Sequence, residues 1–159
     1  MNVYTTKGAI TITCHKRITP YLEQEVRELG FTVEDSFVTG VHISGTVNDC
    51  IKLNLNLRCA SQVLYSLKQF EARDADAIYN NLVDYPWETI LPDSGYFSVT
   101  SNVSNETINN NLFANLRVKD AIVDRLREKT GKRLASGSEL TGAVFNLFWK
   151  NDYAEIFIY

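Results

Sequence analysis

The first 71 residues alternate between strand-like and helix-like patterns in an order that few folds accept. β-Branched and apolar runs predict strands at residues 9–14, 31–37, 41–44 and 62–70. Apolar residues at helical spacing predict one helix between the first two strands and another before the last. The order β-α-β-β-α-β is that of the ferredoxin-like unit. The sequence therefore predicts an α+β protein that begins with a ferredoxin-like unit.

The ends of these two helices are predicted from residues with distinct backbone preferences. Thr19 is expected to cap the first helix, with Pro20 in its first turn, and Gly30 is expected to end it. Asn48 or Asp49 is expected to cap the second.

A short charged segment, residues 71–76, then predicts a domain boundary. We expect an N-terminal ferredoxin-like domain over residues 1–72 and a second α/β domain over residues 73–159. The elements predicted for the second domain are a helix from about Asp76, a strand from Tyr96, a helix that carries Val118, Ile122 and Leu126 and ends at Gly131, and a hairpin of residues 143–149 and 153–159.

Charge is distributed unevenly along the chain. Residues 107–133 hold seven basic and three acidic side chains, a local net charge of +4, whereas the whole chain carries −3 and the remainder therefore −7. A basic island that follows an Asn-rich loop is typical of a surface that meets a polyanion, and we expect RNA rather than DNA. The alternative is a solvated helix face, in which Arg117 pairs with Asp120 and Asp124 with Arg127.

RNA-binding proteins place amide and aromatic side chains against unstacked bases and basic side chains against phosphates. Candidates of both kinds lie in and around the basic island. The predicted RNA-binding residues are Asn102, Asn105, Asn111, Phe113, Lys119, Lys132 and Arg133. Phe113 is equally compatible with a place in the core.

The motifs of common enzymes and metal sites are missing from the sequence. His15 and His42 stand far apart without an acidic or metal-ligating companion, and the three cysteines have no C-x-x-C spacing. We therefore expect a non-catalytic chain with no metal and no cofactor of its own. Without a signal peptide or a long apolar run, we expect a cytoplasmic protein without a membrane partner.

Four short segments of the sequence resemble segments of a known protein family. They are Leu57–Ser61 (LRCAS), Tyr85–Trp87 (YPW), Phe97–Val99 (FSV) and above all Arg117–Asp124 (RVKDAIVD). In this order they resemble the N-terminal half of bacterial 23S ribosomal-RNA guanine-N2 methyltransferases. There a ferredoxin-like domain precedes a THUMP domain, an RNA-binding module also found in tRNA-modifying and 4-thiouridine-forming enzymes. The resemblance implies that residues 73–159 form a THUMP domain.

The family continues beyond the final hairpin into a catalytic domain that binds S-adenosylmethionine. This sequence ends within the apolar segment 156–159, so we expect a THUMP domain that is incomplete at its C-terminus. We also expect a covalently linked methyltransferase domain that would hold the cofactor. The implied function is to position ribosomal RNA for that domain. The alternative is a ligand-sensing or dimerising ferredoxin-like regulatory domain that does not bind RNA.

Overall fold

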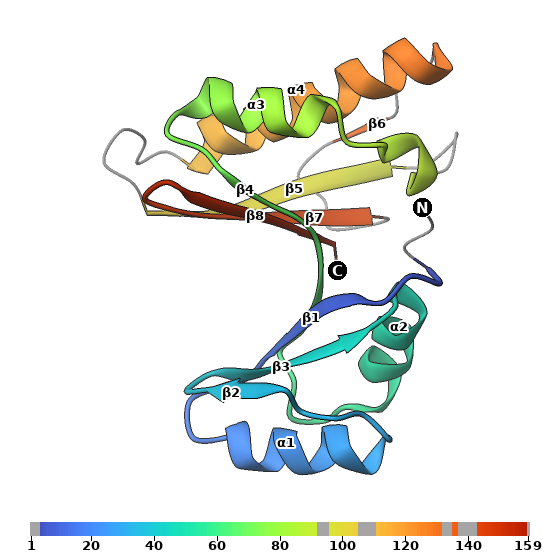
Figure 1. Ribbon diagram of the computed structural model, residues 1–159, viewed down its shortest axis with the longest axis vertical. Helices are drawn as coiled ribbons and strands as arrows, with labels where there is room; N and C mark the ends of the chain where they lie inside the picture. Colours follow the sequence, from blue (N-terminus) through green and yellow to red (C-terminus); the bar gives the residue numbers. More distant parts are fainter. Residues whose placement is uncertain (1–3, 92–95, 105–110, 132–134, 137–142, 159) are drawn as a thin grey trace. The chain divides into compact units, whose positions relative to one another are not determined.

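The computed structural model of the protein describes residues 4–91, 96–104, 111–131, 135–136 and 143–158 (Figure 1). The chain forms two compact units, and the division between them lies between Ser66 and Leu67. Strand β4 (Gln62–Glu71) runs through this division and contributes residues to both units. The predicted α+β class is confirmed.

The first unit has the predicted β-α-β-β-α-β order. Its elements are β1 (Gly8–Thr13), α1 (Thr19–Glu28), β2 (Asp35–Phe37), β3 (Gly40–Gly45), α2 (Val47–Asn56) and the first half of β4. Its strands lie in the order β2-β3-β1-β4, and each neighbouring pair is antiparallel.

Alternation along the strands gives this unit one apolar face. Ile10 and Ile12 of β1 lie opposite Ile43 and Val41 of β3, and all four side chains are buried. Leu22 of α1 and the other buried helix residues complete the core. Gly40 is required where β3 approaches β1, because a Cβ there would lie 2.3 Å from the carbonyl oxygen of Ile12.

Both predicted N-caps of this unit are wrong. Thr19 is already helical, and its hydroxyl donates to the carbonyl of Val38 at 2.8 Å, so the cap position falls to Ile18. In α2 the cap is Thr46, which exchanges hydrogen bonds with Asp49 in a capping box. Asp49 is thus the third helical residue, where a carboxylate reaches back to the cap.

The strand predicted over residues 31–37 covers only Asp35–Phe37. The N–H of Phe31 donates to the carbonyl of Val26, and that of Gly30, at φ +95°, donates to Arg27. These two bonds form a Schellman motif, which confirms that Gly30 ends α1. Phe31 therefore belongs to the helix terminus and not to a strand.

The second unit contains the remaining helices and strands. They are α3 (Ala75–Val83), the 3-10 turn η1 (Trp87–Thr89), β5 (Tyr96–Ser104), α4 (Asn111–Thr130), β6 (Ala135–Ser136), β7 (Ala143–Lys150) and β8 (Tyr153–Ile158). The strand order is β4-β8-β7-β5-β6; β5 runs parallel to β6 and β7, whereas β7 and β8 form the predicted antiparallel hairpin.

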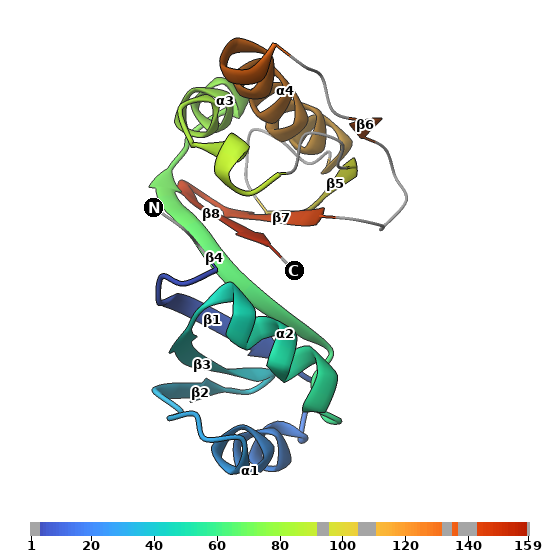
Figure 2. The same cartoon turned by 90° about the vertical axis from the view of Figure 1, so that its right-hand side faces the viewer.

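Helices α3 and α4 lie side by side over one face of this sheet (Figures 1 and 2). Two tryptophans of this unit are fully buried, and each donates an indole hydrogen bond to a backbone carbonyl. Trp87 donates its indole N–H to the carbonyl of Leu82 and meets the Phe145 ring edge-on, with 5.0 Å between centroids. Trp149 of β7 donates to the carbonyl of Ala72. No helix in the described ranges combines the length and apolarity that a membrane span requires.

Candidate nucleic-acid interface

The end of β5 and the start of α4 bring two of the predicted RNA-binding residues together. Asn102 and Asn111, both exposed, line a groove of about 210 Å³. Phe148 and Lys150 of β7 also line this groove. The groove thus combines two amides, an aromatic ring and an ammonium group, which are the groups that contact bases and phosphates in RNA complexes.

The parallel register of β5 and β7 accounts for this convergence. Asn102 pairs with Phe148 and Ser104 with Lys150, so the C-terminal ends of both strands reach the same edge of the sheet. Asn111 begins α4 at that edge. The first N–H groups of a helix have no intrahelical partner and favour an anion there.

The structure also locates Phe113 and Lys119 on α4. The Phe113 side chain is 47% exposed, so its ring is available to a ligand rather than buried in the core. Lys119 is half-buried and lines a second groove on another side of the helix. The other three predicted residues, Asn105, Lys132 and Arg133, lie outside the described residues.

Arg117 interacts with side chains of its own unit. Its guanidinium lies over the Tyr79 ring, 4.5 Å from the centroid, and 3.4 Å and 3.6 Å from carboxylate oxygens of Asp120 and Asp76. The predicted Arg117–Asp120 pair is confirmed. The charge of Arg117 is therefore largely compensated within the protein.

The second predicted pair of this helix, Asp124 with Arg127, does not form in the described part of the chain. Asp124 instead accepts a hydrogen bond from the hydroxyl of Tyr79 on α3. This bond raises the pKa of the Tyr79 phenol. The prediction failed because it considered neighbours on one helix only, whereas α3 packs against this face.

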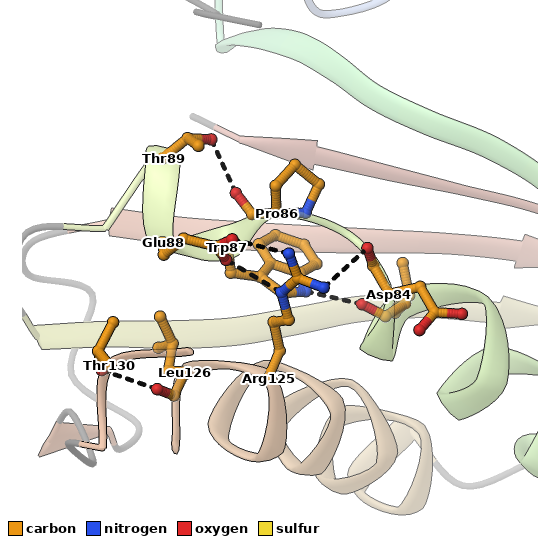
Figure 3. Close-up of polar contacts among 9 residues, drawn as sticks. Asp84, Pro86, Trp87, Glu88, Thr89, Arg125, Leu126 and Thr130 are labelled. Carbon is orange, nitrogen blue, oxygen red and sulfur yellow. Dashed lines mark hydrogen bonds and ion pairs between the residues drawn. The ribbon is translucent and has the colours of Figure 1, made fainter. Parts of the chain in front are cut away.

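Arg125 is the second cation of the basic island that forms an ion pair within the protein. Its guanidinium donates two hydrogen bonds to the Glu88 carboxylate, at 2.7 Å and 3.1 Å, and so links α4 to η1 (Figure 3). Both side chains are at least three-quarters buried. The bonds from Arg125 lower the pKa of Glu88. This pair is thus a structural link of the second unit.

A pH dependence follows from the Arg125–Glu88 pair. Because the pKa of Glu88 is lower in the folded protein than in the unfolded chain, its stabilising contribution is present above the unfolded pKa and is lost as the pH falls through the folded pKa. Replacing Glu88 with Gln should lower the free energy of unfolding by about 1–2 kcal/mol at neutral pH. Urea unfolding at pH 7 and at acidic pH should show this difference shrink with acid. A difference independent of pH would contradict the assignment.

The cations of α4 that remain for a ligand are Lys119, Arg127 and Lys129. None of the three forms an ion pair with any described residue. Lys150 adds a further exposed charge beside Asn102. The surface is therefore less basic than the count of residues suggests, and its free cations lie on both α4 and the end of β7.

The structure adds site residues that sequence reasoning missed. Phe148 and Lys150 were assigned only to the terminal hairpin, and the register that brings them beside Asn102 is a tertiary property. Leu112 and Leu116 are apolar and are 71% and 53% exposed. Their spacing was a detectable signal, because they do not fall among the buried positions of α4, such as Val118 and Ile122.

His42 lies among residues of the first unit. His42 stacks on Phe37 and shares a hydrogen bond with the hydroxyl of Thr11. Among the described residues there is no group of three or more His, Cys, Asp or Glu side chains that could hold a metal ion.

Comparison with known proteins identifies two domains. Residues 9–64 match the RlmL ferredoxin-like domain, and residues 72–150 match the THUMP domain. A protein of Syntrophotalea carbinolica named ribosomal RNA large subunit methyltransferase K/L is 33% identical over 144 residues. The alignment covers 91% of this chain but 20% of that protein, so the chain spans about one fifth of this relative.

Two solved structures have the same fold at low sequence identity. A Listeria monocytogenes protein described as a predicted N6-adenine-specific DNA methylase superposes with a TM-score of 0.80 at 24% identity, covering 96% of this chain and 40% of that one. A 4-thiouridine synthetase in complex with RNA and ATP superposes with a TM-score of 0.54 at 12% identity, covering 95% of this chain and 41% of that one.

Proposed function

Since the chain belongs to the family that joins an RlmL ferredoxin-like domain to a THUMP domain, we propose that it is an RNA-binding module that positions ribosomal RNA for a linked methyltransferase domain. The observation that carries the proposal is the groove in which Asn102, Asn111, Phe148 and Lys150 converge. The name of the Syntrophotalea relative supplies the substrate class.

Two further observations support RNA as the ligand. The solved 4-thiouridine synthetase of the same fold is a complex with RNA. Lys150 lies beside the start of α4 and Lys119 lies farther along the helix, and neither forms an ion pair with a described residue. Arg117 and Arg125, in contrast, form ion pairs within the protein. Phosphate contacts from a few exposed cations give moderate affinity that depends strongly on salt, which is compatible with a chain of net charge −3.

In this account the described residues bind and orient RNA and do not act on it chemically. Base contacts would come from the amides and from Phe113, and phosphate contacts from the lysines. Lys132, Arg133 and Asn105 are included in the proposal on sequence grounds. S-adenosylmethionine would be held by the linked domain and would supply the methyl group there.

The experiment that tests this function is a binding titration of the chain with a structured fragment of large-subunit ribosomal RNA at increasing salt. We expect saturable binding whose affinity falls steeply and linearly on a log–log plot. Duplex DNA of equal length should bind more weakly. A chain that ignores RNA but elutes as a concentration-dependent dimer would contradict the proposal and favour the regulatory alternative.

A further inference from the structure

A second groove lies between one face of α4 and the edge of β5. Leu112, Asn115, Leu116 and Lys119 line it from the helix, where they recur at i, i+3, i+4 and i+7 and so share one face. Residues 97–99 of β5 line the opposite wall. The groove has a volume of about 360 Å³, at the lower end of the range for small-molecule sites. It is separate from the groove beside Asn102.

The edge of β5 in this groove has little strand pairing. In the described part of the chain, β6 pairs with β5 only at Tyr96 and Phe97, while β7 occupies the other side of the strand. Among the described residues, no strand pairs with the outer edge of β5 beyond Phe97. A strand edge presents backbone N–H and C=O groups that can bond to a ligand.

The helix wall combines apolar surface with an unpartnered polar atom. Leu112 and Leu116 are 71% and 53% exposed, which is unusual for two leucines on one face of a helix. Between them, the side-chain oxygen of Asn115 is buried and has no hydrogen-bond partner among the described residues. A buried amide oxygen without a partner costs stability. The side chain that carries it lines the groove and so places an amide beside a ligand there.

We propose that this groove holds a single unstacked base of the bound RNA. A nucleotide offers a flat apolar face of its base to the two leucines, a polar base edge to the amide of Asn115 and a phosphate to Lys119, so it matches all three features of the groove. The free charge of Lys119 favours a polyanion over an uncharged partner. The inference rests on the proposed function, because it names where one nucleotide of that RNA is held.

The test is a double-mutant cycle between protein and RNA. The probe is a ribosomal RNA stem-loop with a single-stranded tail of seven nucleotides, in which each tail position is replaced in turn by an abasic ribose. For the intact probe, Leu116→Ala should weaken binding by about fivefold to tenfold, the loss expected for one apolar wall. At one tail position the abasic probe should bind the wild-type and Leu116→Ala proteins equally. Leu55→Ala, which removes an 81% exposed leucine of α2, is the matched control and should have no effect.

A second variant separates recognition from folding. Asn115→Leu removes the unpartnered amide oxygen, so the melting temperature should rise while the preference among bases at the sensitive tail position is lost. Additive effects of Leu116→Ala and every abasic replacement would overturn the base site yet leave the proposed function intact. The same additivity, with Leu116→Ala converting a dimer to a monomer, would assign the groove to a second copy of the chain. Absence of binding to the intact probe would instead refute the proposed function itself.

Discussion

Replacing Trp87 with alanine is expected to lower the free energy of unfolding of the second unit by about 3–5 kcal/mol, the usual cost of removing a large aromatic side chain from a core. The indole is fully buried, donates to the carbonyl of Leu82 at 2.8 Å and packs edge-on against Phe145. Its removal would leave a cavity below η1 and a carbonyl without its partner.

Urea unfolding monitored by circular dichroism measures this loss. Trp87→Phe is the matched control, because it keeps an aromatic ring and removes the indole donor, and it should cost about 1–3 kcal/mol. A loss of less than about 1 kcal/mol for Trp87→Ala would contradict the central place of this residue in the core.

Replacing Phe113 with alanine is expected to lower RNA affinity and to leave stability almost unchanged. The ring is 47% exposed, so stability should change by no more than about 0.5 kcal/mol. If the ring stacks on a base, affinity for single-stranded RNA should fall by about 1–3 kcal/mol, because every base offers a flat apolar face. Binding to the stem-loop probe and thermal unfolding of the same samples measure both quantities.

The control for Phe113 is Tyr21→Ala, which removes a 63% exposed ring from α1 of the first unit and should leave RNA affinity unchanged. A melting temperature lowered by several degrees in Phe113→Ala, with unchanged affinity per folded molecule, would show that Phe113 is structural.

Except for the short elements η1 and β6, the order of elements was predictable because it depends on local patterns. Alternation in β1, helical spacing in α1 to α4 and the glycine that ends α1 are each encoded within a few neighbouring residues. The capping residues were not predictable in the same way. The hydroxyl of Thr19 prefers the carbonyl of Val38, which is distant in sequence, to the helix that begins beside it.

The candidate site was predictable only in part for the same reason. Asn102, Asn111, Phe113 and Lys119 were identified by residue type and charge, and the structure exposes the first three. The ion pair between Arg125 and Glu88 joins two residues that are 37 positions apart in the sequence. A count of charges therefore could not exclude Arg125 from the candidate binding surface. Lys150 was missed because its place beside Asn102 depends on the pairing of β5 with β7.

The cations of α4 therefore divide into those that form ion pairs within the protein and those that have no ion-pair partner among the described residues. Arg117 and Lys119 are two residues apart and carry the same charge. Arg117 is engaged by Asp76, Asp120 and the Tyr79 ring, whereas Lys119 has no ion-pair partner among the described residues. This contrast provides a matched pair of variants within one helix.

The most direct test of RNA binding by this surface is the slope of log affinity against log salt for the wild-type, Lys119→Gln and Arg117→Gln proteins with the ribosomal RNA fragment. Each lost phosphate contact should lower the magnitude of the slope by about 0.7–0.9, so Lys119→Gln should show this decrease and Arg117→Gln should not. Lys132→Gln and Arg133→Gln should behave like Lys119→Gln. If all of these variants keep the wild-type slope, the basic helix is an ordinary solvated face and the assignment of this surface to RNA is wrong.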